Sequence, residues 1–195
     1  MSGRLRSAPP PGTPLKCALA GGFVEELSHS GIYLGDGRVA ELRGDGRLVA
    51  VPLSDFLNGD AGALDVFALR TGFRIHAACD AAGGAPLASS AAAGTAWNLT
   101  VGKGGRLRVP YDLLSDNCHR FTAGCVRGSF KGEEKGEWMI GRLEGVIADT
   151  LNGGRPVIWR AVHPDTPGFR YAATPGKHLQ HWGAMLWGIR RVLAP

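Results

Sequence analysis

The sequence is poor in cysteine and has no long apolar run, and both absences narrow what the chain does. Its four cysteines, Cys17, Cys79, Cys118 and Cys125, form no C-x-x-C pair, so the sequence predicts no zinc ribbon. We expect these thiols to be free in a reducing cytosol. No segment is apolar over the roughly 18 residues that a transmembrane helix needs, and the N-terminal residues do not resemble a signal peptide. The expected location is the cytoplasm, with peripheral membrane contact or specialised secretion left open.

Nucleic-acid motifs are also missing. The net charge is +5 and the isoelectric point is about 9.3, but the basic residues are scattered rather than clustered. No helix-turn-helix, zinc-finger or RNA-binding signature is present, so we interpret the positive charge as a solubilising surface and expect no nucleic-acid partner. His178 and His181 lack both helical ligand spacing and carboxylate neighbours, so we expect no metal site and no cofactor.

The composition is typical of one globular domain built from short elements. The chain has 195 residues, 44% of them hydrophobic, with 30 glycines and 12 prolines that favour frequent turns. The patterns predict a flexible leader (1–11), strands (14–20, 63–70, 155–162), a meander (22–52) and a helical turn capped by Ser54 (52–57). They also predict helices over 86–102, within 111–128 and 137–154, and over 177–194, with Gly128 ending the second of these.

The segment SHSGIYLGDGRVAEL, residues 28–42, is typical of a tight β-hairpin. His29 stands on its first arm and Glu41 on its second, and a plain structural hairpin needs neither. A two-residue turn at Asp36 and Gly37 would put these side chains on opposite faces, whereas a three-residue turn or a bulge would put them on one face. Whether His29 and Glu41 meet therefore depends on the turn.

Cys118, in SDNCHRF, lies where a loop is expected to become a helix. A thiol at a helix N-terminus feels the positive end of the helix dipole, which lowers a thiol pKa and favours the nucleophilic thiolate. His29 is the candidate base and Glu41 the candidate group that orients it. We expect His119 to lie at the surface or in a cap, and Cys125 to lie in the core.

These residues together resemble a known family. HSGIYLGDGRVAEL followed by YDLLSDNCHRF is similar to the lecithin:retinol acyltransferase (LRAT) and H-Ras-like suppressor family. That family is the circularly permuted branch of the NlpC/P60 papain-like superfamily. It shows a His-x-Gly/Ala-Ile-Tyr-x-Gly-Asp strand motif, then a polar residue, then a later Asn-Cys motif. The order of His29 before Cys118 matches the permuted branch, and the resemblance covers residues 10 to 128.

The resemblance implies an α+β permuted papain-like fold, with an antiparallel sheet packed on the helix that bears Cys118. It implies an LRAT-like domain over residues 12–128, and we expect residues 129–195 to form a helical extension packed on it. Cys118 would be the nucleophile, His29 the base and Glu41 the orienting group, where lipid-acting members usually have a second His. Asn117 and Tyr111 are the candidate supports of the oxyanion. The implied reaction passes through a Cys thioester, and its substrate is an acyl lipid, as for a phospholipase A or an acyltransferase.

Two other functions stay open on the sequence. The same Cys-His-Glu set would serve a peptidase or peptidoglycan amidase, including a secreted toxin. A catalytically inactive binding module would keep the motifs without the reaction. The Trp-rich helix predicted over 177–194 would pack on the core, lie at a lipid surface or meet a protein partner.

Overall fold

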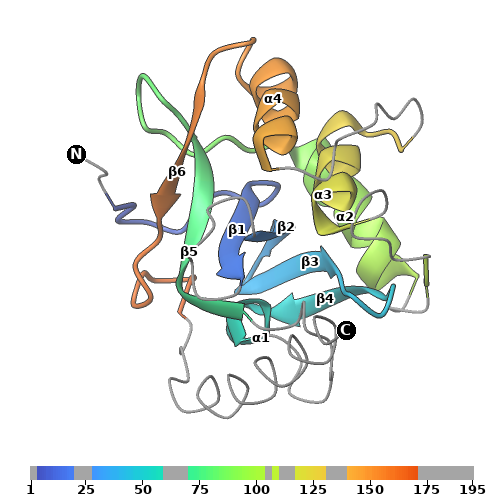
Figure 1. The fold of residues 1–195 in the computed structure, drawn as a ribbon. Coiled ribbons are helices and arrows are strands. Elements are labelled where there is room, and N and C mark those ends of the chain that lie inside the picture. The colour runs from blue at the N-terminus through green and yellow to red at the C-terminus, as the bar shows by residue number, and fades with distance from the viewer. Residues whose placement is uncertain are drawn as a thin grey trace, which may run out of the picture.

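The computed structural model describes residues 4–19, 28–58, 70–103, 107–109, 117–130 and 140–170. These residues form an α+β fold around one six-stranded sheet with the order β4-β3-β2-β1-β5-β6, in which every neighbouring pair is antiparallel (Figure 1). The strands are β1 (Pro14–Leu19), β2 (Ser28–Gly35), β3 (Arg38–Leu42), β4 (Leu48–Pro52), β5 (Arg70–Asp80) and β6 (Val157–Ala161). The helices are α1 (Leu53–Asn58), α2 (Ser90–Trp97) with a π turn η3 (Asn98–Gly102), α3 (Cys118–Arg127) and α4 (Ile140–Leu151).

The sheet separates two apolar clusters, because neighbouring residues of a strand point to opposite faces. On one face Ile32 packs with residues of α3 and α4 such as Phe121 and Leu143. On the other face Tyr33 packs with Phe56 of α1 and with side chains of β1, β4 and β5. Helices α2, α3 and α4 therefore cover one face, and α1 covers the other, as Figure 1 shows.

Helix α3 begins and ends where the sequence predicts. The side chain of Asn117 caps its start by accepting hydrogen bonds from the backbone N–H groups of His119 and Arg120. Gly128 ends it in the left-handed conformation, with φ of 71°. These two residues fix Cys118 as the first residue of the helix.

Four sequence predictions need correction. Residues 4–11 are not a flexible leader, because the Leu5 N–H donates to the Ala161 carbonyl at 3.0 Å and both Leu5 and Ala8 pack on the apolar cluster around Tyr33. Helix α1 begins at Leu53, directly after β4, so Ser54 lies inside the helix and its hydroxyl bonds the Asp55 carboxylate instead of capping. Strand β5 was not predicted, and of the strand expected over 63–70 only Arg70 lies among the described residues. Residues 129–195 are not a purely helical extension, because β6 pairs with β5 in the same sheet. The predicted boundary at residue 128 thus does not mark the edge of the sheet.

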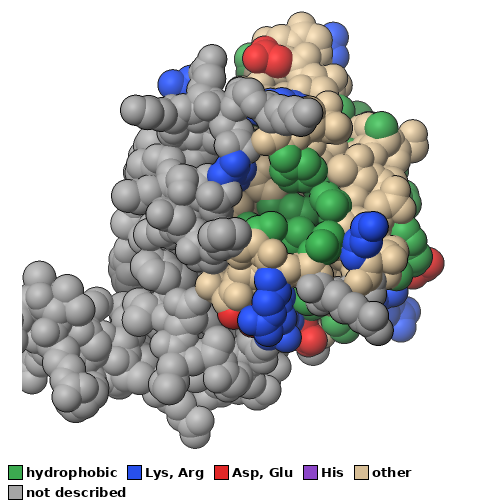
Figure 2. All heavy atoms as spheres, turned by 90° about the vertical axis from the view of Figure 1, so that its right-hand side faces the viewer, with side chains coloured by type: hydrophobic (Ala, Val, Ile, Leu, Met, Phe, Trp, Pro, Cys, Tyr) green, Lys and Arg blue, Asp and Glu red, His purple; other side chains and the backbone are tan. Residues whose placement is uncertain are grey.

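The described surface carries some apolar side chains but no membrane-crossing element. Within the described ranges, no helix combines the length and apolar character that crossing a bilayer requires. Trp97, at the end of α2, and Phe130, after α3, are the exposed large hydrophobic residues there, at 44% and 40% of their full exposure. Figure 2 shows hydrophobic side chains gathered in a hollow on the side of the molecule that carries α2 and α3, with Lys and Arg side chains near its margin.

Candidate active site

The hairpin of β2 and β3 brings His29 and Glu41 onto one face through a bulge. Its turn has two residues, Asp36 and Gly37, with φ of 47° and 70°, as a type I′ turn requires. The register then shifts, because Tyr33 pairs with Val39 while Gly35 pairs with Arg38, so Leu34 is the extra residue. Of the two routes that the sequence left open, the chain uses the bulge.

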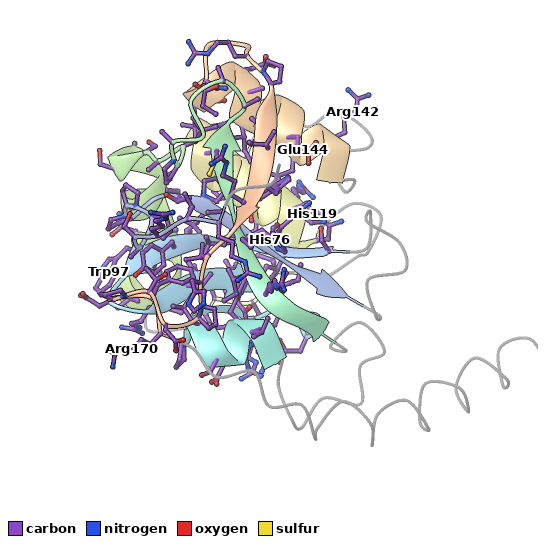
Figure 3. The ribbon with its side chains drawn as sticks, turned by 90° about the vertical axis from the view of Figure 1, so that its left-hand side faces the viewer. His76, Trp97, His119, Arg142, Glu144 and Arg170 are labelled. Atoms are coloured by element: carbon purple, nitrogen blue, oxygen red, sulfur yellow. The ribbon has the colours of Figure 1, made fainter. Side chains whose placement is uncertain are left out.

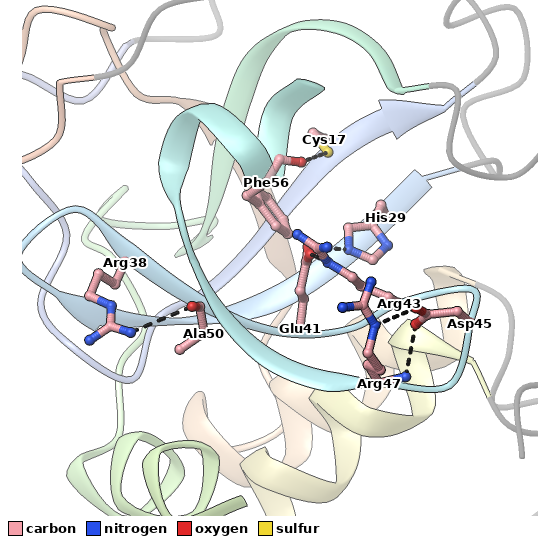
Figure 4. A network of polar contacts seen from close by, with 9 residues as sticks. All are labelled: Cys17, His29, Arg38, Glu41, Arg43, Asp45, Arg47, Ala50 and Phe56. Atoms are coloured by element: carbon pink, nitrogen blue, oxygen red, sulfur yellow. Dashed lines mark hydrogen bonds and ion pairs between the residues drawn. The ribbon is translucent and has the colours of Figure 1, made fainter. Parts of the chain in front are cut away.

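The carboxylate of Glu41 is the centre of a buried polar cluster. His29 Nε2 lies 2.9 Å from Glu41 Oε2, and Arg43 Nε donates to Glu41 Oε1 at 3.0 Å (Figure 4). Glu41 is fully buried and His29 is 5% exposed. Burying a carboxylate is costly unless it is paired and hydrogen-bonded, and here each oxygen has a partner. With Nε2 on Glu41, any proton that His29 exchanges with a nucleophile must pass through Nδ1.

Phe56 and Gly31 complete the surroundings of His29 on this face. The rings of His29 and Phe56 lie 5.2 Å apart between centroids. A Cβ atom at Gly31 would come within 2.5 Å of the Ala40 carbonyl oxygen and 3.2 Å of the Phe56 ring. Gly31 is therefore required for the close approach of the Ala40 backbone, and it leaves room for the Phe56 ring.

Cys17 is a second thiol near His29 that sequence reasoning missed. Cys17 on β1 pairs directly with His29 on β2, so the two side chains share a face. The Cys17 thiol donates to the Phe56 carbonyl at 3.4 Å and is fully buried (Figure 4). Finding this neighbour requires the register of β1 against β2, which the sequence of either strand alone does not give.

Cys118 and His29 lie on different elements, since Cys118 begins α3 and His29 belongs to β2. The side chain of Ser30 points to the α3 face, where its hydroxyl meets Thr122 Oγ1 at 3.0 Å, so His29 points to the opposite side of β2. Cys118 is the first residue of α3 and 4% exposed. The first turn of α3 lies against the first residues of β2 through the contact of His119 with Ser30, so Cys118 lies near the end of the strand where His29 stands, while the His29 side chain points to the face covered by α1.

His119 is buried rather than at the surface, which corrects the prediction. His119, labelled in Figure 3, is 3% exposed. Its Nδ1 lies 2.8 Å from the hydroxyl of Ser30. Burial, followed by the electrostatic effects of His29 and Lys16, lowers the pKa of His119 to about 3, opposed by a hydrogen bond to the Ser28 backbone. His119 is thus neutral at physiological pH. Its position next to Cys118 was visible in the sequence, but its orientation depends on how α3 docks on the sheet.

The remaining predicted residues divide into those described and those not. Cys125 lies in the core as expected, and burial strongly raises the pKa of its thiol. Tyr111 and the helix predicted over 177–194 lie outside the described residues. Within the described part of the chain, no group of three His, Cys, Asp or Glu side chains is arranged to hold a metal ion.

Comparisons of the chain with protein-family models, curated proteins and solved structures found no match.

Proposed function

We propose that this chain is a cysteine-dependent acyl-transfer enzyme with a permuted papain-like arrangement, in which Cys118 is the nucleophile and His29 and Glu41 complete the triad. The observation that carries the proposal is the buried hydrogen bond between His29 and Glu41. This ionisable pair is removed from water beside the Phe56 ring. Burying it lowers the stability of the fold relative to a hairpin with apolar residues at the same two positions. Such costly pairs concentrate at functional sites.

The positions of the two thiols in the fold support Cys118 as the nucleophile over Cys17. Cys118 begins a capped helix, where the N-terminal dipole stabilises a thiolate. Cys17 lies mid-strand, fully buried, with its thiol proton engaged by the Phe56 carbonyl. The resemblance of the two motifs to the LRAT and H-Ras-like suppressor family also places the nucleophile at Cys118.

The reaction then follows from the roles of these groups. The Cys118 thiol passes its proton to His29 Nδ1, and the sulfur attacks the carbonyl carbon of an ester. The backbone N–H of Cys118 would donate to the oxyanion. When the tetrahedral intermediate collapses, the C–O bond breaks, the alcohol leaves with the proton of His29, and the acyl group stays on sulfur as a thioester. Water or another acceptor, deprotonated by His29, then removes the acyl group, while Glu41 stabilises each imidazolium form.

An acyl lipid is the substrate class that the surface and the resemblance favour. Trp97 and Phe130 are exposed, and Figure 2 shows hydrophobic side chains gathered in a hollow on one face, which suits an apolar substrate. A peptidase would need a groove that accepts extended polypeptide, and no observation on the described residues favours that alternative.

The test is fatty-acid release from phosphatidylcholine vesicles by wild type, Cys118→Ala, His29→Ala and the matched thiol control Cys17→Ala. The proposal predicts release by wild type and Cys17→Ala, and loss of release in the other two. Fatty-acid release that persists in both Cys118→Ala and His29→Ala would contradict the mechanism. Release that disappears only in Cys17→Ala would move the nucleophile to β1.

A further inference from the structure

His119 stands between the two elements that carry the proposed catalytic residues. Its backbone N–H is bound by the Asn117 cap at the start of α3. Its ring reaches β2, where Nδ1 meets the Ser30 hydroxyl at 2.8 Å and the ring also contacts the Ser28 backbone. Ser28 and Ser30 are the two neighbours of His29 in the strand. One side chain, adjacent to Cys118 in sequence, thus holds β2 on both sides of His29.

The hydroxyl network sets the role of Nδ1. Thr122 Oγ1 donates its proton to the Cys118 carbonyl, so the Ser30 hydroxyl donates to Thr122 Oγ1. A hydroxyl has one proton, so Ser30 accepts a hydrogen bond from the Nδ1–H of His119.

The titratable groups that face the ring disfavour its protonation. Lys16 comes from β1 and His29 from β2, and both disfavour a positive charge on His119. A ring kept neutral in this way is a poor proton carrier near neutral pH, so its contribution to the site is geometric. The buried Thr122, one turn along α3, bonds both the Ser30 hydroxyl and the Cys118 carbonyl and extends the same helix–strand contact.

We propose that His119 is a positioning residue that fixes the start of α3 against β2 and thereby sets the alignment of Cys118 with His29. This inference rests on the proposed function, since it concerns how the nucleophile meets its base. Misplacement of reacting groups by about 1 Å can cost about 10²-fold in rate, so a ring that locks two elements together at this point matters for catalysis.

The test measures alkylation of Cys118 by iodoacetamide as a function of pH, with the modified residue assigned by peptide mass mapping so that Cys118 is resolved from the other thiols. The variants are His119→Phe, which keeps a ring without hydrogen bonds, and His119→Gln and His119→Asn, which retain a polar group near one ring nitrogen each. Thr100→Val is the matched control, because it removes a buried hydroxyl-to-carbonyl hydrogen bond of the same kind, to Ala96 at 2.7 Å, away from His119. Alkylation of buried Cys17 reports any general loosening of the fold.

In wild type we expect the half-maximal alkylation rate at least about one pH unit below that of an ordinary thiol, which lies near pH 8.5. His119→Phe should shift this midpoint upward by about one unit or more, the Gln and Asn variants should recover part of the shift, and Thr100→Val should keep the wild-type midpoint. An unchanged midpoint in His119→Phe, or an equal shift in Thr100→Val, would overturn the positioning role alone. An ordinary midpoint in wild type would instead show that the Cys118 thiol is not activated as the proposed function requires, and the role of His119 would fall with it.

Discussion

At the level of single residues, the carboxylate of Glu41 decides whether the imidazole of His29 is oriented and stabilised as a base. Glu41→Gln keeps the size of the side chain and removes its charge. We expect kcat to fall by about 10² to 10⁴-fold, the range of a lost acid–base function, and the free energy of unfolding to fall by about 1–3 kcal/mol as Arg43 loses its carboxylate. Ester turnover and urea unfolding measure the two effects.

Asp45→Asn is the control for this substitution. Asp45 also pairs with an arginine, Arg47, but at an exposed site, where such a pair contributes little. We expect turnover and stability close to those of wild type. Equal losses in Glu41→Gln and Asp45→Asn would mean that the buried carboxylate has no special role.

His119 also gives the fold a pH dependence with a definite sign. Its pKa is about 3 in the folded chain, against about 6.5 in the unfolded chain. Between these two pH values the unfolded chain binds a proton at His119 that the folded chain does not bind. The contribution of His119 to the free energy of unfolding is therefore fully present above about pH 6.5. It is lost as the pH falls below that value, by up to about 1.4 kcal/mol per pH unit.

His119→Gln has no such titration and isolates this effect. The stability of wild type relative to His119→Gln should decline by about 2 kcal/mol between about pH 7 and pH 5, with all other groups common to both proteins. Urea unfolding at several pH values measures it. A difference that stays constant over this range would show that His119 is not kept neutral by the fold.

At the level of elements, the N-terminal cap of α3 holds the turn that carries Cys118 and His119. Asn117→Ala removes a side chain that accepts two backbone hydrogen bonds and should cost about 0.5–2 kcal/mol of stability. Ser89→Ala removes the corresponding cap of α2 and should cost a similar amount. Only Asn117→Ala should also slow alkylation of Cys118. Equal rates of Cys118 alkylation in the two variants would show that the Asn117 cap does not affect the reactivity of Cys118.

The elements also show what the sequence could and could not predict. Strands β3, β4 and β6 and helices α3 and α4 were predicted because their alternation, stripes, caps and terminal glycines are local signals. Strand β5 was missed because it places Ala77, Ala78 and Cys79 between β1 and β6, and small residues carry little β-propensity. Its partners lie far away in the chain, so tertiary pairing rather than local preference forms it.

The candidate site follows the same division. The pairing of His29 with Glu41 was predicted as a possibility, but only the bulge at Leu34 realises it, and the glycines of the turn allowed either outcome. The burial of His119 and the position of Cys17 opposite His29 depend on helix docking and on strand register. Those are properties of the assembled sheet, which neither motif encodes by itself.

At the level of the whole molecule, the sheet is completed by residues beyond the predicted domain boundary. Strand β6 pairs with β5, and α4 packs on α3. A chain ending at residue 128 would expose one edge of β5 and the apolar cluster that Leu143 and Ile147 fill. We expect this truncation to lose cooperative unfolding, as followed by circular dichroism in urea. A cooperative transition in the truncated chain would restore residues 12–128 as an independent domain.

The central claim is that Cys118, served by His29 and Glu41, takes up an acyl group. The measurement that tests it most directly is the intact mass of the protein after incubation with phosphatidylcholine vesicles, for wild type, Cys118→Ala and Cys17→Ala. The account predicts an acyl-sized mass gain in wild type and Cys17→Ala, removed by hydroxylamine as a thioester would be, and no gain in Cys118→Ala. An acyl adduct that persists in Cys118→Ala, or no adduct in any of the three proteins, would contradict it.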